Sequence, residues 1–161
     1  WLERHTMELP PPIGRIDGHL FETVDSFLLP KVWPSLRTLE FFVDSRVPGL
    51  NAAFTLAGHV PAFLRLMDRY QSLGLVVARR FGASAGGLGY EIERPGGEVV
   101  RFALVTADRA YRIGASPAVL AARNIAGARF EPRGLLACDE LVAPEELFRY
   151  LSSLGVRVEQ S

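Results

Sequence analysis

Residues 90–106, YEIERPGGEVVRFALVT, decide the fold class of this chain. The first four residues alternate between apolar and charged side chains, a period of two that is typical of a half-buried β-strand. Residues 95–97 are Pro-Gly-Gly, which is the chemistry of a turn, and residues 99–106 form a second run of β-favouring residues. The segment therefore predicts a β-hairpin.

Upstream of the hairpin the pattern changes from strand to helix. Residues 36–47 are rich in β-formers and predict a strand. Residues 50–58 carry apolar side chains at helical spacing, and residues 61–73 repeat them every three or four positions, so each predicts a helix. The apolar run 75–81 either extends the second helix after a break at Gly74 or begins a new element.

Downstream of the hairpin we expect two helices and a last strand. Ser116 and Pro117 have the chemistry of an N-cap and a first helical turn, and Gly127 ends that helix. Residues 144–154 begin with Pro-Glu-Glu and continue with one apolar face, and residues 156–158 are strand-like. The order of elements predicts an α+β fold with an antiparallel or mixed sheet and helices packed mainly on one face, not a doubly wound parallel sheet.

The N-terminal residues differ in character from the rest of the chain. Three consecutive prolines and Gly14 deny regular structure to residues 1–16, which we interpret as an arm or linker. Residues 17–161 are expected to form a single α+β domain, in which residues 17–33 are either strand or irregular. Because the sequence begins without an initiator Met, we expect it to have been cut from a longer protein.

Composition excludes several classes of function. The 18 basic residues, of which only Lys31 is lysine, balance 18 acidic residues, and the arginines are scattered, which argues against nucleic-acid binding. The single cysteine, Cys138, excludes an internal disulfide and is interpreted as a small buried apolar residue, so a reducing, cytoplasmic location is expected. No apolar run approaches the ~18 residues of a membrane span.

Two patterns that often carry chemistry have the wrong context here. The glycine-rich run 82–89 leads into a strand, whereas a phosphate-binding loop leads into a helix, so we interpret it as a flexible connector. The three histidines, His5, His19 and His59, lack the short spacing of metal ligands, so no metal site is expected.

The candidate binding residues lie where predicted elements end. Asp44 and Arg46 follow a predicted strand, a place where ligand contacts are often mounted, and Arg46 suits a substrate carboxylate; the alternative is a salt bridge between strand and helix. Tyr111 and Arg112 before a predicted helix are similar candidates. His59 is either an acid or base near neutral pH or a residue of a helix junction.

Three stretches taken together resemble the C-terminal region of saccharopine dehydrogenase-like oxidoreductases. They are VDSRVPGLN at 43–51, ASPAVLAAR at 115–123, and the residues from Gly134 to Phe148. The chain departs from the family at residues 137–140, Ala-Cys-Asp-Glu, where the family places Pro-Glu after a Gly-Val pair. The resemblance therefore does not single out saccharopine as the substrate.

The resemblance implies a substrate-binding and dimerisation domain of an enzyme that moves a hydride between NAD or NADP and an amino-acid-derived secondary amine or imine. It implies a missing N-terminal nucleotide-binding domain, a homodimer, and no cofactor bound by this chain alone. Arg46 and Arg112 would bind substrate carboxylates, with Asp44, His59 and Tyr111 as secondary candidates; no catalytic residue is assigned. The alternative is a non-catalytic dimerisation or small-molecule-binding module.

Overall fold

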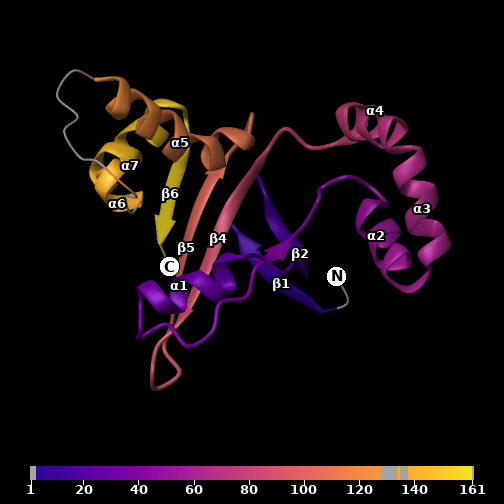
Figure 1. Ribbon diagram of the computed structural model, residues 1–161, viewed down its shortest axis with the longest axis horizontal. Helices are drawn as coiled ribbons and strands as arrows, with labels where there is room; N and C mark the ends of the chain where they lie inside the picture. The colour runs from indigo at the N-terminus through magenta and orange to yellow at the C-terminus, as the bar shows by residue number, and fades with distance from the viewer. Residues whose placement is uncertain (1–2, 128–133, 135–137, 161) are drawn as a thin grey trace. The chain divides into compact units, whose positions relative to one another are not determined.

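The computed structural model describes residues 3–127, 134 and 138–160. Within these residues the protein has the α+β fold class that its sequence predicts, and its strands form two antiparallel sheets of three strands each. It divides into two compact units, one of residues 1–8 with 15–83 and the other of residues 9–14 with 84–161. Figure 1 shows the path of the chain through both, and each unit is described by itself below.

The sheet of the first unit has the strand order β1-β2-β3. Its strands are β1 (Arg4–Leu9), β2 (Gly14–Leu20) and β3 (Phe42–Val43). β2 and β3 are antiparallel, with His19 opposite Val43. A side chain on Gly18 would place its Cβ only 2.9 Å from the Cβ of Phe42, so the close approach of β2 and β3 requires glycine there.

The expectation of irregular chain over residues 1–16 is wrong, because β1 and the first part of β2 lie there. The prolines fall in the turn between the two strands, where the amide of Ile13 donates to the carbonyl of Pro10 over 3.1 Å. Proline is tolerated in a turn because no ladder hydrogen bond is lost there. The predicted domain boundary at residue 16 is a separate statement, and it stays a prediction.

The helices of the first unit fill most of its remaining length. They are α1 (Asp25–Val32), α2 (Leu50–His59), α3 (Pro61–Arg69) and α4 (Gln71–Phe81). The helix predicted at 50–58 is confirmed. The helix predicted at 61–73 ends earlier, because the chain bends at Tyr70 rather than at Gly74, and the undecided run 75–81 belongs to α4. The strand predicted at 36–47 is reduced to β3.

The described part of the second unit contains the predicted hairpin and three helices. Its elements are β4 (Gly86–Glu93), β5 (Val99–Thr106), α5 (Tyr111–Ala126), α6 (Cys138–Leu141), α7 (Pro144–Ser153) and β6 (Arg157–Gln160). β4 pairs with β5 along its whole length and β5 pairs with β6, both antiparallel. The hairpin, the helix at 144–154 and the last strand are confirmed.

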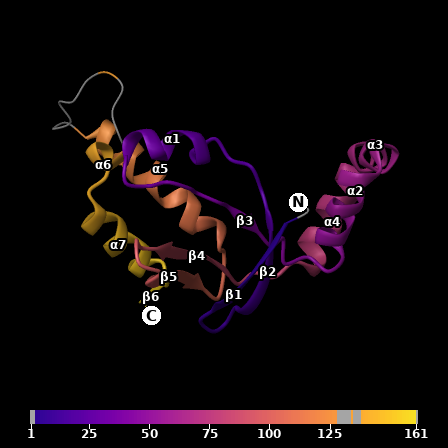
Figure 2. The same ribbon diagram turned by 90° about the horizontal axis from the view of Figure 1, so that it is seen from below.

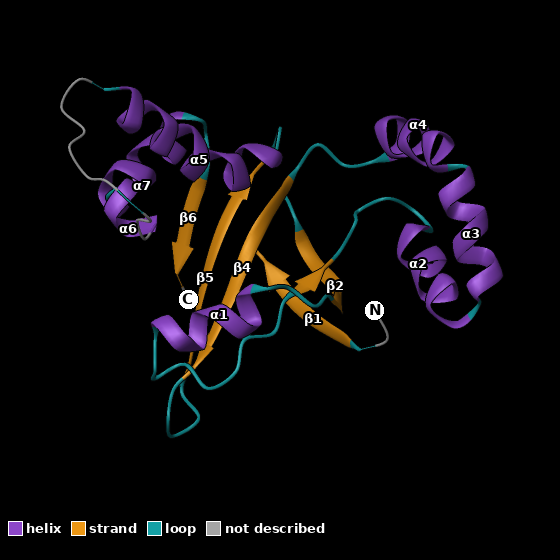
Figure 3. Cartoon of the chain, in the orientation of Figure 1, coloured by secondary structure: helices purple, strands orange, loops and turns teal. Residues whose placement is uncertain are grey.

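The core of the second unit lies between its sheet and its helices. Ile113 of α5, Leu151 of α7 and Val156 are buried together, with Leu88 and Leu104 of the sheet packed against them. α5 and α7 cover the same face of the sheet (Figures 2 and 3), because both helices present their apolar face to it.

The opposite face of this sheet is covered at one place by residues 9–14. Val105 is fully buried there, and Ile13 is also buried. A Cβ on Gly87 would lie 2.9 Å from Cδ1 of Ile13 and would overlap the carbonyl oxygen of Leu104. The guanidinium of Arg157 also donates to the carbonyl of Pro11.

Two expectations for this unit are wrong. The glycine-rich run 82–89 is only in part a connector, because Gly86, Gly87 and Gly89 belong to β4. Ser116 is not an N-cap, because α5 begins five residues earlier at Tyr111; its buried hydroxyl donates to the carbonyl of Arg112 over 2.6 Å, inside the helix. The side chain of Cys138 lies outside the described part of the chain, so its predicted burial stays a prediction.

Candidate functional site

The loop from Asp44 to Asn51 joins β3 to α2 and is held by its own side chains. Oδ1 of Asp44 accepts two hydrogen bonds of 2.9 Å, one from the amide of Arg46 and one from Nδ2 of Asn51. Oδ1 of Asn51 in turn accepts a bond of 3.2 Å from the amide of Ser45. Asparagine at the start of the helix therefore fixes the chain that precedes the helix.

Arg46 lies at the bend of this loop in a left-handed conformation, with φ of 49°. Its carbonyl accepts a hydrogen bond of 3.4 Å from the amide of Ala83, and the next amide, of Val47, donates to the hydroxyl of Ser45 over 3.3 Å. A positive φ is uncommon for a residue other than glycine and persists where surrounding contacts determine it. These hydrogen bonds hold the backbone of Arg46 in the left-handed conformation.

The structure thus brings together two of the residues singled out from the sequence, Asp44 and Arg46. The carboxylate of Asp44 positions the backbone of Arg46. Arg46 is half-buried, and its Nε is shielded from water. A guanidinium on a fixed loop, partly removed from water, is suited to a carboxylate, because the planar fork makes two parallel charge-assisted hydrogen bonds.

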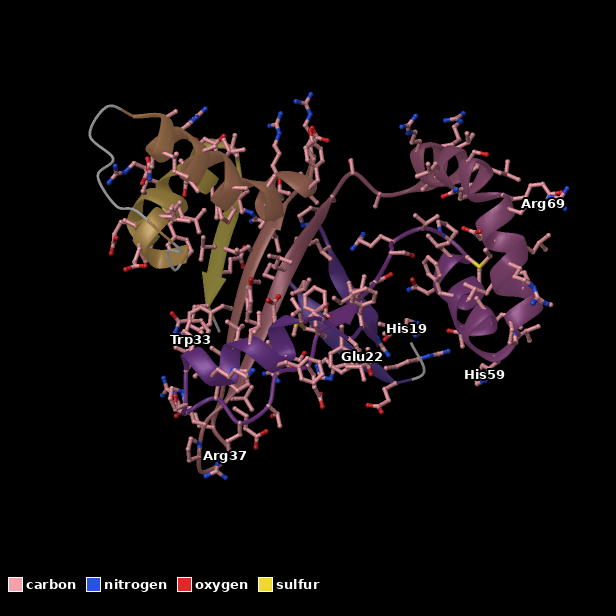
Figure 4. The ribbon with its side chains drawn as sticks, in the orientation of Figure 1. His19, Glu22, Trp33, Arg37, His59 and Arg69 are labelled. Carbon is pink, nitrogen blue, oxygen red and sulfur yellow. The ribbon has the colours of Figure 1, made fainter. Side chains whose placement is uncertain are left out.

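His59 lies away from this loop. It is exposed and is the last residue of α2, at the turn into α3 (Figure 4). Since a helix rises by about 1.5 Å per residue, the ten residues of α2 place His59 roughly 15 Å from the loop that precedes the helix. The position matches the helix-junction alternative, and His59 does not share a site with Arg46.

Tyr111 and Arg112 occupy the first turn of α5, in the second unit. Tyr111 is 71% exposed, whereas Arg112 is half-buried and its amide donates to the carbonyl of Arg109 over 2.9 Å. Adjacent residues of a helix point in different directions, so the two side chains do not form a joint site. Arg112 is the better carboxylate candidate of the pair.

Sequence reasoning missed the contribution of Asn51 to this loop and, outside the loop, the left-handed backbone of Arg109. Asn51 closes the loop around Arg46 through its side-chain hydrogen bonds. The sequence feature that could have indicated this role is an Asn at the start of a helix, seven residues after Asp44. Arg109 has a φ of 51° and forms an ion pair with the carboxylate of Asp108 at 3.2 Å. It follows a turn in which the hydroxyl of Thr106 donates to the carbonyl of Asp108 over 2.9 Å.

The three histidines belong to three different elements, β1, β2 and α2. His19 is buried in β2, and the ring of His5 lies 5.2 Å from that of Phe42. Over residues 3–127, 134 and 138–160 there is no group of three or more His, Cys, Asp or Glu placed to hold a metal ion. In the same part of the chain, no helix combines the length and the apolar character that crossing a membrane requires.

Comparison with known proteins returned no relative: no family model, no curated protein and no solved structure matches the chain. The resemblance to saccharopine dehydrogenase-like oxidoreductases therefore stays a prediction, carried by its three stretches of sequence. The first stretch, residues 43–51, coincides with the loop that positions Arg46. The third lies in part outside the described residues.

Proposed function

We propose that this chain is the substrate-binding and dimerisation domain of a saccharopine dehydrogenase-like, NAD(P)-dependent oxidoreductase acting on an amino-acid-derived secondary amine or imine. The observation that carries the proposal is the hydrogen-bonded loop 44–51, which coincides with the first resembling stretch and holds Arg46 at a fixed place. A nicotinamide cofactor on a separate N-terminal domain would supply the hydride chemistry. The predicted cytoplasmic location belongs to the same proposal.

In this proposal Arg46 binds a carboxylate of the substrate. Its half-buried position favours the interaction because the attraction between opposite charges is weakened less by solvent there than at an open surface. Asp44 acts as a positioning residue through its bond to the amide of Arg46. Arg112 stays a second carboxylate candidate, and the exposed His59 and Tyr111 stay secondary ones.

The first test reads the parent gene upstream of the codon for Trp1. A predicted strand, a Gly-x-Gly-x-x-Gly turn and a helix would support the oxidoreductase, because this combination binds the pyrophosphate of a dinucleotide. A gene that encodes no nucleotide-binding segment would contradict the proposal.

The second test measures NAD(P)H-linked kinetics of the intact protein with amino-acid conjugates. R46A is expected to raise KM for the carboxylate substrate by about 10- to 100-fold, the loss of one charge-assisted contact of about 1.5–3 kcal/mol. R46K should recover part of the loss, because it keeps the charge but not the fork. R109A is the matched control, since Arg109 has a similar positive φ. Equal KM values in R46A, R109A and wild type would remove Arg46 from the site.

A second candidate function is a non-catalytic dimerisation module. It is favoured by the helices of the first unit, because α1, α3 and α4 contain no buried residue and expose large apolar side chains. The two candidates differ in ligand binding. A protein that self-associates and binds neither NAD(P)H nor amino-acid carboxylates, in its intact form, would favour the module.

A further inference from the structure

We propose that the first unit forms a two-fold homodimer in which the region around α1 of each copy packs on α3 and α4 of the other. This deepens the dimerisation part of the proposed function and rests on that part alone. Two surfaces carry the proposal, and both belong to the same unit.

The first surface, called the α1 surface, consists of the exposed apolar side chains between Phe21 and Trp33. Phe27 is 69% exposed and Trp33 57%, and α1 has no buried residue at all. The full set is Phe21, Val24, Phe27, Leu28, Val32 and Trp33. Figure 4 shows Glu22 and Trp33 at the two ends of this segment.

The second surface, called the α3–α4 surface, is formed by two consecutive helices without a buried residue. In α3 only Phe63 and Met67 are partly covered, and in α4 only Ala78. The exposed apolar side chains include Leu64, Leu66, Leu73, Leu75, Val76 and Phe81. An isolated helix as short as α4 is marginally stable in water, so its stability depends on a surface that covers it.

The two surfaces carry opposite charge. Residues 21–33 contain Glu22 and Asp25 against Lys31, a net charge of −1. Residues 61–81 contain Arg65, Arg69, Arg79 and Arg80 against Asp68, a net charge of +3. All eight side chains are exposed. Packing the α3–α4 surface on its own copy would place like charges together, whereas packing it on the α1 surface places opposite charges together.

The apolar area matches that of a stable dimer. Twelve side chains about half exposed, each of the order of 100 Å², present roughly 1,000 Å² per copy, compared with the roughly 800 Å² per partner of a standard protein interface. Contiguous exposed apolar patches larger than a few hundred Å² are rare on monomers and mark interaction sites. Since a two-fold interface is reciprocal, each copy contributes both surfaces and the contact is made twice.

The test uses two charge-reversed variants of the full chain. E22R/D25R changes the α1 surface from −1 to +3, because two acids become two bases. R65E/R79E changes the α3–α4 surface from +3 to −1, with one arginine replaced in each helix. All four positions are exposed, so the fold is expected to survive, which circular dichroism checks. Native mass spectrometry resolves the two homodimers and the heterodimer by mass.

We expect wild type to dimerise, each variant alone to dimerise at least about tenfold more weakly, and an equimolar mixture to form the heterodimer with near wild-type affinity. The mixture restores opposite charges at both contacts. F27D should also abolish the dimer, whereas F148D, at an exposed phenylalanine of the second unit, should not. Fluorescence of Trp33 in a W1F background should shift to shorter wavelength on association.

Other outcomes overturn the proposal. If wild type stays monomeric at about 100 μM, the protein has no such interface. If the monomer sediments with anionic vesicles, the α3–α4 surface binds a membrane surface instead. Variants that dimerise like wild type place the interface elsewhere, and a mixture that stays monomeric excludes the reciprocal pairing. These results leave substrate binding untouched, because Arg46 is altered in none of the variants.

Discussion

Nδ2 of Asn51 donates a 2.9 Å hydrogen bond to Oδ1 of Asp44, and this contact ties the first turn of α2 to the end of β3. Asp44 in turn accepts from the amide of Arg46. The left-handed conformation of Arg46 is thus maintained by a side chain five residues further along the chain. The conformation of the loop therefore depends on a small number of side-chain hydrogen bonds within the loop itself.

Replacement of Asn51 by alanine removes two of these hydrogen bonds, those to Asp44 and from Ser45. We expect the free energy of unfolding to fall by about 1–2 kcal/mol, measured by urea titration at pH 7. N51D is the informative comparison, because it keeps the acceptor for Ser45 but places a second carboxylate beside Asp44. Because a carboxylate cannot donate to Asp44, N51D should also be less stable than wild type at pH 7. Wild-type stability in N51A would show that the loop does not need this contact.

Replacement of Gly87 by alanine should destabilise the second unit by about 1–3 kcal/mol, because the new Cβ overlaps the carbonyl of Leu104 and presses on Ile13. Gly114, within α5, is the matched control, since a Cβ there meets nothing within 4 Å. G114A should stabilise the protein by about 0.5–1 kcal/mol, because alanine favours helix. Thermal unfolding followed by circular dichroism measures both, and equal shifts in the two variants would contradict the packing at Gly87.

Valines at the two ends of β5 differ in burial and should differ in their effect on stability. Val105 is fully buried, whereas Val99 is 41% exposed. V105A is expected to cost about 2 kcal/mol through lost apolar burial and the cavity left behind, and V99A less than about 0.5 kcal/mol. Chemical unfolding with both variants in parallel measures the difference. Similar losses would show that the face covering Val105 is open in solution.

The hydroxyl of Tyr90 should make stability depend on alkaline pH. Partial burial raises its pKa above the ordinary value of about 10, since the ionised form is less well solvated in the fold. The unfolded chain then releases this proton at lower pH than the folded chain, so the contribution is present below about pH 10 and is lost as pH rises through the folded pKa. Tyr90 is 47% exposed, so the effect is small. Urea unfolding between pH 8 and 11 should show a steeper decline for wild type than for Y90F, and parallel curves would contradict it.

Local signals explain which elements could be predicted from the sequence. The β4–β5 hairpin has strict alternation and its own turn residues, so its pattern needs no distant contact. β1 and β2 were missed because the prolines between them were interpreted as marking irregular chain, whereas they form only the turn. The start of α5 was misplaced because Ser116 has capping chemistry but bonds to the carbonyl of Arg112 inside the helix.

The candidate site was predictable only in part. Asp44 and Arg46 were found because polar residues after a strand often bind ligands. The contribution of Asn51 was not found, because it depends on the fold of the loop that brings its amide to Asp44. The separation of His59 from Arg46 follows from the length of α2, which the sequence placed correctly. Of the five candidates, the structure joins one pair by a hydrogen bond, Asp44 and Arg46.

The assignment of residues 9–14 to the second unit affects how the protein is synthesised and divided. The chain passes between its two units at residues 8–9, 14–15 and 83–84. Residues 9–14 leave the ribosome early, but the strands that Ile13 packs against are translated more than seventy residues later. The second unit therefore completes its folding after translation of its last strand. No single cut separates the two units into intact pieces, so neither can be exchanged between genes as a contiguous module.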